Sequence, residues 1–163
     1  MYSTGTKVVY PTHGVGWIEA IEKKEVAGGL QPFYVVRIIG NGMTILVPTK
    51  NAKRVGLREV IEPSEIPKVL AVLNLKKTDL EISSNWNRRF KDNLERIRTG
   101  SLFEVALVLR KLVLLQKERS LSFGEKTMLE NVRRLIVSEI SHASGIDQER
   151  ARALVEQAVG NHR

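Results

Sequence analysis

The sequence predicts an α+β protein in which a small antiparallel β domain is followed by a compact all-α helical domain. Two observations predict this order. Residues 5–48 contain short β-branched and aromatic runs separated by turns, whereas residues 63–163 carry apolar residues at helical spacing. The chain of 163 residues is long enough for two small domains. We therefore expect two modest hydrophobic cores.

Four strand-length runs are expected in the N-terminal part of the chain, because β-branched and aromatic residues favour strands. These runs are Lys7–Tyr10, Gly16–Ile21, Phe33–Ile39 and Thr44–Val47. Turn residues separate them, and among these Asn41-Gly42 is the strongest hairpin signal. Such short strands indicate a small curled antiparallel sheet or barrel.

The C-terminal part predicts a series of helices joined by short polar loops. Helices are expected from Pro63, over 85–98, over 101–118, over 123–143 and after Asp147. Two of the starts, Ser101–Glu104 and Ser122–Glu125, fit the capping box, in which Ser and Glu satisfy each other's backbone donors. The helix over 101–118 is apolar on most sides and should be the hub. We expect a β domain over 1–55, a connector over 56–62 and a helical domain over 63–163.

The amino-acid composition limits the classes of partner and the cellular compartment that we expect for this protein. The formal charge is +8, which favours acidic partners. The absence of cysteine excludes disulfides, cysteine-ligated metals and thiol catalysis. The longest apolar stretch, Leu102–Leu115, contains two cations and is too short to span a bilayer, and the N-terminus has no apolar signal segment. We expect a cytoplasmic protein without a membrane partner.

The sequence contains little that predicts an enzyme. His13, His142 and His162 lie far apart and have no metal-ligand spacing, so each is interpreted as a surface or turn residue. Gly14-Val15-Gly16 lacks the third glycine and the following helix of a dinucleotide site. No phosphate-binding loop, nucleophile elbow or isolated carboxylate pair is present. We therefore predict no catalytic residues, no metal and no cofactor.

The most informative stretch in the helical part is Asn85–Lys91, which places an indole in a first helical turn beside three cations. Guanidinium groups pair with phosphate oxygens, and a helix N-terminus adds backbone N–H donors. These features predict contact with a nucleic-acid backbone, through Trp86, Arg88, Arg89 and Lys91. An exposed indole at this end could also insert between base steps from the minor groove.

A second interpretation of the same stretch is structural. Trp86, Phe90, Leu94 and Ile97 share one helical stripe, and periodicity alone favours a core role for all four. The cations could equally form an ordinary solvated face. Phe123 also has two interpretations, as part of its helix start or as part of an exposed apolar patch for a partner.

The sheet offers a candidate surface for a protein partner. Outward residues and exposed edges of small sheets are places where a partner can add a strand. The candidates are Lys24, Val36, Leu46 and Pro48. Their alternative interpretation is that they are ordinary sheet residues.

Several sequence blocks occur in an order that resembles one known family. They are GTKVVYPTHGVGWIEAIE, ILVP, VGLR, NWNRRFKDNL and SFGEK followed by ML. The chain resembles the CarD/CdnL family of bacterial transcription regulators over its full length. This resemblance implies a Tudor/SH3-like RNA polymerase interaction domain, similar to that of transcription-repair coupling factors, followed by a helical DNA-binding domain.

The resemblance also implies roles for individual residues. Trp86 matches the family's wedge tryptophan, and Arg88, Arg89 and Lys91 match its DNA-contacting cations, so the resemblance favours an outward Trp86 over a core one. The positions that match the surface for the RNA polymerase β subunit are Lys24, Val36, Leu46 and Pro48. Some relatives have arginine at the positions of Lys24 and Leu46, and an apolar contact from Leu46 would replace the charged one.

Together these observations predict a monomeric regulator that binds the polymerase β subunit and stabilises the open promoter complex. It would place the Trp86 wedge and the basic helix at the upstream edge of the bubble. Its contacts to promoter DNA would use the minor groove and the phosphates, with little sequence specificity. The alternative is a protein–protein adaptor that is tethered to RNA polymerase without touching DNA.

Overall fold

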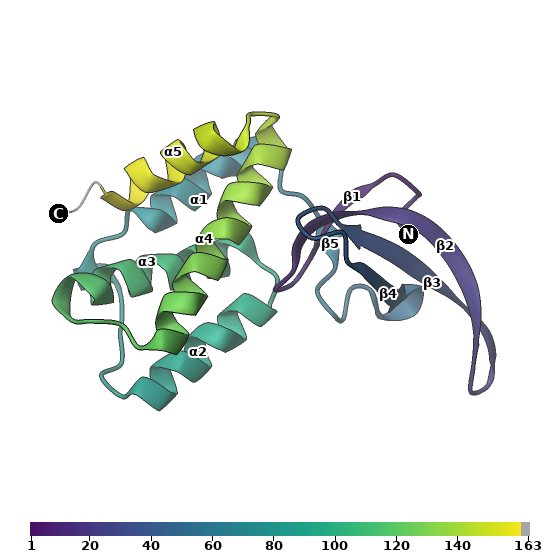
Figure 1. Ribbon diagram of the computed structural model, residues 1–163, viewed down its shortest axis with the longest axis horizontal. Helices are drawn as coiled ribbons and strands as arrows, with labels where there is room; N and C mark the ends of the chain where they lie inside the picture. The colour runs from purple at the N-terminus through teal and green to yellow at the C-terminus, as the bar shows by residue number, and fades with distance from the viewer. Residues whose placement is uncertain (161–163) are drawn as a thin grey trace. The chain divides into compact units, whose positions relative to one another are not determined.

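The computed structural model describes residues 1–160, which form two compact units divided between Val60 and Ile61 (Figure 1). The first unit is a five-stranded antiparallel sheet, and the second contains five α-helices. The predicted α+β class is confirmed. His162 lies outside the described residues, so its predicted surface role is not addressed.

The sheet has the order β4-β3-β2-β1-β5, with every neighbouring pair antiparallel. Its strands are β1 (Lys7–Tyr10), β2 (Gly14–Val26), β3 (Gly29–Ile38), β4 (Thr44–Pro48) and β5 (Arg58–Glu59). Its own hydrophobic core is built around Val8, Ile18, Tyr34, Val36, Ile38, Val47, Ala52 and Leu57. β4 and β5 are the two edges of this sheet.

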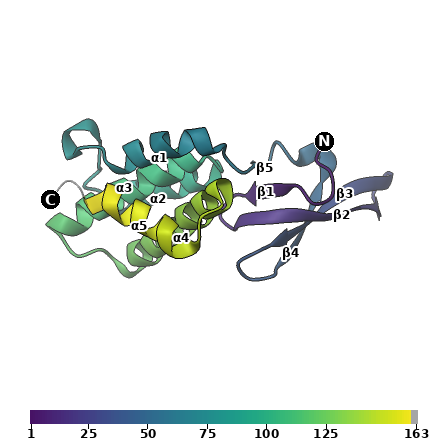
Figure 2. The ribbon, with the colours of Figure 1, turned by 90° about the horizontal axis from the view of Figure 1, so that it is seen from above.

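β2 and β3 are longer than their apolar runs predicted, and together they form a long curved hairpin (Figures 1 and 2). The register continues from Gly16↔Ile38 out to Val26↔Gly29, although the outer half of β2 is exposed. Backbone ladder hydrogen bonds hold that half together without a buried face, and an apolar pattern cannot reveal such a strand. At the inner end, a Cβ on Gly16 would lie 2.4 Å from the carbonyl oxygen of Arg37, so only glycine allows this approach.

The predicted connector over 56–62 is partly a strand. Arg58 and Glu59 form β5, which pairs with Val9 and Val8 of β1. A two-residue strand has too few positions for an alternating pattern, and so the sequence shows no signal for it.

The helical unit follows the predicted order closely. Its helices are α1 (Ile66–Leu73), α2 (Trp86–Arg98), α3 (Leu102–Glu118), α4 (Phe123–Ser144) and α5 (Gln148–Gly160). α3 is the hub, as predicted, and it packs against α1, α2 and α4, while α5 lies beside α1 and α4 (Figure 1). Its apolar residues are buried on most sides and form the centre of the second core.

The helix starts show which capping predictions hold. The capping box at Ser122 and Glu125 is confirmed, and the Asp147 carboxylate accepts from the N–H of Arg150. At the start of α3, Ser101 accepts from the Glu104 N–H, but the Glu104 carboxylate binds Arg96. The predicted box is therefore only half formed there, because a cation from α2 competes for the carboxylate.

The hub also contains a fully buried arginine that the apolar pattern did not predict as core. The Arg110 guanidinium donates to the carbonyl oxygens of Leu75, at 2.7 Å, and Val159, at 2.8 Å. These carbonyls lie just beyond α1 and near the end of α5, where helices leave carbonyl groups without helical partners. Burial lowers the pKa of the Arg110 guanidinium, which stays charged because an arginine pKa starts so high.

Candidate functional site

Trp86 is the first residue of α2, and the residue is 42% exposed. One face stacks on Phe90, with ring centroids 5.0 Å apart and an interplanar angle of 16°. The indole Nε1–H donates to the Ser122 hydroxyl at 2.9 Å. Farther along the stripe, Phe90 and Leu94 pack against the core and Ile97 is buried within it. The stripe therefore runs from an exposed first residue to a buried last one.

The start of α2 combines a helix cap with free positive charge. The Asn85 side chain accepts from the N–H of Arg88 at 3.0 Å, and no acidic residue lies in the first turn. Arg88 and Lys91 are both exposed, and neither forms an ion pair within residues 1–160. The start of α2 thus combines helix-end N–H groups with two exposed cations on the first turns of the same helix, an arrangement suited to an anionic ligand.

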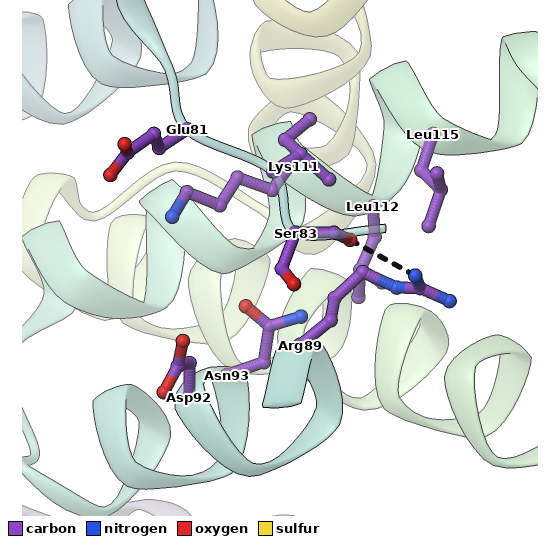
Figure 3. Close-up of a pocket in the computed structure, with 9 residues that line it drawn as sticks. Glu81, Ser83, Arg89, Asp92, Asn93, Lys111, Leu112 and Leu115 are labelled. Carbon is purple, nitrogen blue, oxygen red and sulfur yellow. Dashed lines mark hydrogen bonds between the residues drawn. The ribbon is translucent and has the colours of Figure 1, made fainter. Parts of the chain in front are cut away.

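Arg89 is placed differently from the other two cations. It is only 6% exposed, and its Nε and Nη2 donate to the two carboxylate oxygens of Glu125 at 2.7 and 3.1 Å. Its Nη1 donates to the carbonyl oxygen of Ser83 at 3.1 Å (Figure 3). The expectation of a DNA contact from Arg89 is therefore at odds with the structure, because its donors are already used inside the unit.

A small cavity lies beside Arg89, between α2, α3 and residues 81–83 (Figure 3). Its volume is about 20 Å³, which is room for a water molecule but not for an organic cofactor. The buried Nδ2 of Asn93 lines it and has no hydrogen-bond partner among the described residues. Lys111 lines it as well, and burial together with the charge of Arg96 lowers the pKa of its ammonium group.

Ser122 and Glu125 join α4 to the start of α2. The Ser122 hydroxyl accepts from the N–H of Glu125 at 3.1 Å and donates to its carboxylate at 3.2 Å. Burial alone would raise the pKa of the Glu125 carboxyl, but hydrogen bonds from Arg89 and Ser122 and the Arg89 charge hold it below its usual value. The sequence showed this pair only as a helix start, because its partners on α2 lie 36 residues away.

The first turn of α4 fits closely against α2. A Cβ on Gly124 would lie 3.3 Å from Cε1 of Phe90, so a glycine here allows close packing. The neighbouring Phe123 is 75% exposed. Of its two interpretations, the structure agrees with membership of an exposed apolar surface. Ser122 lies directly before Phe123 in the chain and accepts a hydrogen bond from Trp86 of α2.

Like the three candidate cations of α2, the candidate protein-binding residues of the sheet include both surface residues and a buried one. Leu46 lies on the edge strand β4 and is 46% exposed, and Pro48 is half-buried at the end of that strand. Lys24 is exposed on the long hairpin, with its ammonium 3.4 Å from the Glu22 carboxylate. Val36 is completely buried in the sheet core. The expectation of a direct contact from Val36 therefore conflicts with its position, because its side chain faces inward.

The described residues were also compared with the requirements of a metal site and of a membrane span. Within residues 1–160, no group of three or more histidine, aspartate or glutamate residues is placed to hold a metal ion. No described helix is both long and apolar enough to cross a bilayer.

His13, which the sequence analysis interpreted as a surface or turn residue, lies in the turn between β1 and β2. Its Nδ1 lies 3.3 Å from the carbonyl oxygen of Pro11.

Comparison with known proteins identifies both units. Residues 2–61 match the family model of the CarD-like/TRCF RID domain, and residues 68–156 match that of the CarD C-terminal domain. The protein named "Putative transcription factor YdeB" of Bacillus subtilis (strain 168) is 33% identical over 153 residues, which cover 94% of this chain and 99% of that protein.

A solved structure described as "CdnLNt from Myxoccoccus xanthus" is 52% identical over 37% of this chain and 86% of that chain, with a TM-score of 0.32. The family matches cover both units in the order that the sequence blocks predicted. The chain therefore belongs to the CarD/CdnL family, whose members are RNA polymerase-interacting transcription regulators rather than enzymes.

Proposed function

We propose that this protein stabilises the open promoter complex by contacting DNA at the upstream edge of the transcription bubble while bound to the RNA polymerase β subunit. The sheet unit is the polymerase-binding domain and the helical unit is the DNA-binding domain, and the protein acts as a cytoplasmic monomer. The exposed indole of Trp86, at the start of a helix that also carries the exposed cations Arg88 and Lys91, is the observation that carries this proposal.

Trp86, Arg88 and Lys91 are the DNA-contacting residues in this proposal. The cations neutralise phosphates and position the helix, which requires no particular base sequence. The indole acts as an apolar wedge at a minor groove that is already distorted at the fork. Arg89 supports the site from inside, because it ties α2 to Glu125 of α4.

The free energy needed is modest. A regulator shifts an equilibrium only by the difference between its affinities for the two states. A preference of about 1.4 kcal/mol for melted over closed DNA changes their ratio tenfold. One partly exposed indole can supply this amount, since base–aromatic stacking contributes about 1–3 kcal/mol.

The polymerase contact is proposed at the β4 edge of the sheet. A strand with a neighbour on one side only offers backbone donors and acceptors to an incoming strand. Leu46 and Pro48 flank that edge and supply apolar contact, and Lys24 adds charge from the hairpin. Val36 packs beneath this face and keeps it in shape.

An adaptor that binds polymerase without touching DNA is the second candidate. It is favoured by one observation, that the indole is already stacked on Phe90 and hydrogen-bonded to Ser122. In that case the exposed cations serve only solubility.

The lifetime of open complexes formed by polymerase with the full-length protein separates the two candidates. Trp86→Ala should shorten this lifetime about tenfold. Leu154→Ala is the matched control, because Leu154 is an apolar side chain of similar exposure on α5. Equal lifetimes for the Trp86→Ala variant and the parent protein, with polymerase binding intact, would reject the wedge and favour the adaptor.

A further inference from the structure

The Ser122 hydroxyl has every hydrogen-bonding position filled. It accepts from the indole Nε1–H of Trp86 at 2.9 Å and from the backbone N–H of Glu125 at 3.1 Å. It donates its own hydrogen to the Glu125 carboxylate at 3.2 Å. A hydroxyl has one donor and two acceptor positions, so these three bonds fix its orientation completely.

The same hydroxyl closes a ring of interactions that begins and ends on α2. From Trp86 the ring passes through Ser122 to Glu125, and from Glu125 it returns through the ion pair to Arg89. Arg89 lies three residues after Trp86, so both anchors are on the same face of the helix. The indole is therefore tied to α4 by its nitrogen while Phe90 supports its ring.

A helix cap does not need this geometry. Ser101 caps α3 with the same residue type and accepts from the N–H of Glu104. No indole reaches that hydroxyl, and Glu104 turns to Arg96 instead. The contact between Ser122 and Trp86 is thus an addition to capping rather than a consequence of it.

We propose that Ser122 is the positioning residue for the indole of Trp86, and that its hydroxyl holds the exposed ring in one orientation before DNA arrives. The assignment of DNA as the ligand rests on the proposed function. A preset side chain does not have to be immobilised on binding, which saves roughly threefold to tenfold in affinity for one side chain. The hydrogen bond also occupies the only polar group of the indole, so the surface left for DNA is apolar.

The test uses the full-length protein with Trp17→Phe, so that a single indole N–H remains. Ser122→Gly removes the acceptor, while glycine is tolerated at a helix N-cap with little loss of stability. Ser122→Thr keeps both the cap and the hydroxyl. Ser101→Gly is the matched control, because it removes a capping hydroxyl that has no indole partner.

Two readouts are needed. The first is solvent exchange of the Trp86 indole N–H in the free protein, followed by NMR. Ser122→Gly should accelerate this exchange at least tenfold, whereas Ser122→Thr and Ser101→Gly should leave it near the parent rate. The second is the open-complex lifetime with polymerase, which should fall about threefold to tenfold for Ser122→Gly alone.

Unchanged indole exchange in the Ser122→Gly variant would overturn the positioning role. So would faster exchange together with a parental lifetime, provided that Trp86→Ala still shortens the lifetime. If Trp86→Ala itself leaves the lifetime unchanged, the proposed function fails, and indole exchange alone then decides whether Ser122 orients the ring.

Discussion

Arg89 of α2 and Glu125 of α4 form a two-bonded ion pair that is almost entirely removed from solvent. Nε and Nη2 lie 2.7 and 3.1 Å from the two carboxylate oxygens, and the side chains are 6% and 1% exposed. The Arg89 guanidinium also holds the carbonyl oxygen of Ser83, just before α2 begins. The pair therefore fixes the start of the helix that carries Trp86.

Removal of either partner should destabilise the helical unit strongly, because it leaves the other charge buried and unpaired. We expect Arg89→Met and Glu125→Gln each to lower the free energy of unfolding by about 3–5 kcal/mol. Urea denaturation followed by circular dichroism measures this.

The matched control for the ion pair is Glu104→Gln. Its partner Arg96 lies on the same helix as Arg89, and both side chains are more than one-third exposed. Its loss should cost at most about 1 kcal/mol. Equal losses for the buried and exposed pairs would show that the Arg89–Glu125 pair adds nothing beyond an ordinary surface contact.

The free energy of unfolding should also fall in acid, because protonation of Glu125 breaks its ion pair with Arg89. The pKa of Glu125 is lowered in the folded protein, so its contribution is fully present above the unfolded glutamate pKa of about 4.3. It is lost as the pH falls through the folded pKa. Urea midpoints between pH 6 and pH 2.5 should drop more steeply for the parent protein than for Glu125→Gln, and parallel curves would contradict this.

The order and approximate bounds of the helices could be predicted from the sequence because their signals are local. Apolar spacing and capping residues lie within the element that they define, and α2 to α5 begin within about a residue of their expected positions. The outer halves of β2 and β3 could not be predicted, since none of their residues is buried and they depend on pairing with each other.

The residue types of the candidate site could be predicted from the sequence. Which of these residues face solvent and which are buried could not. Arg88, Arg89 and Lys91 look alike in sequence, yet one faces inward because Glu125 arrives from another helix. Val36 and Leu46 also look alike, and only sheet geometry turns one inward and the other outward. The role of Ser122 depends on a residue 36 positions away, which no local pattern contains.

The exposed cations should make the affinity for DNA depend on the salt concentration rather than on the DNA sequence. Arg88→Ala or Lys91→Ala should each reduce by about one the slope of log affinity against log salt concentration for fork DNA in the polymerase complex. The loss should be similar for different promoters. Lys68→Ala is the control, because Lys68 is an exposed cation on α1. An equal change in slope for Lys68→Ala would indicate a diffuse charge effect rather than a site.

The proposed polymerase-binding edge, β4, can be tested by placing a charge where a side chain points outward. Leu46→Glu puts a carboxylate on the exposed face of β4 and should abolish polymerase pull-down without unfolding the sheet. Val55→Glu adds the same charge at an exposed apolar residue of the sheet unit outside its strands and serves as the control. Val36→Ala should act differently, because it removes buried methyl groups and lowers the free energy of unfolding by about 2 kcal/mol. At a temperature where that variant stays folded, it should still bind polymerase. Retention of binding by the Leu46→Glu variant would exclude this part of β4 from the interface. Loss of binding by the folded Val36→Ala variant would show that the interface depends on the shape of the sheet rather than on its edge residues.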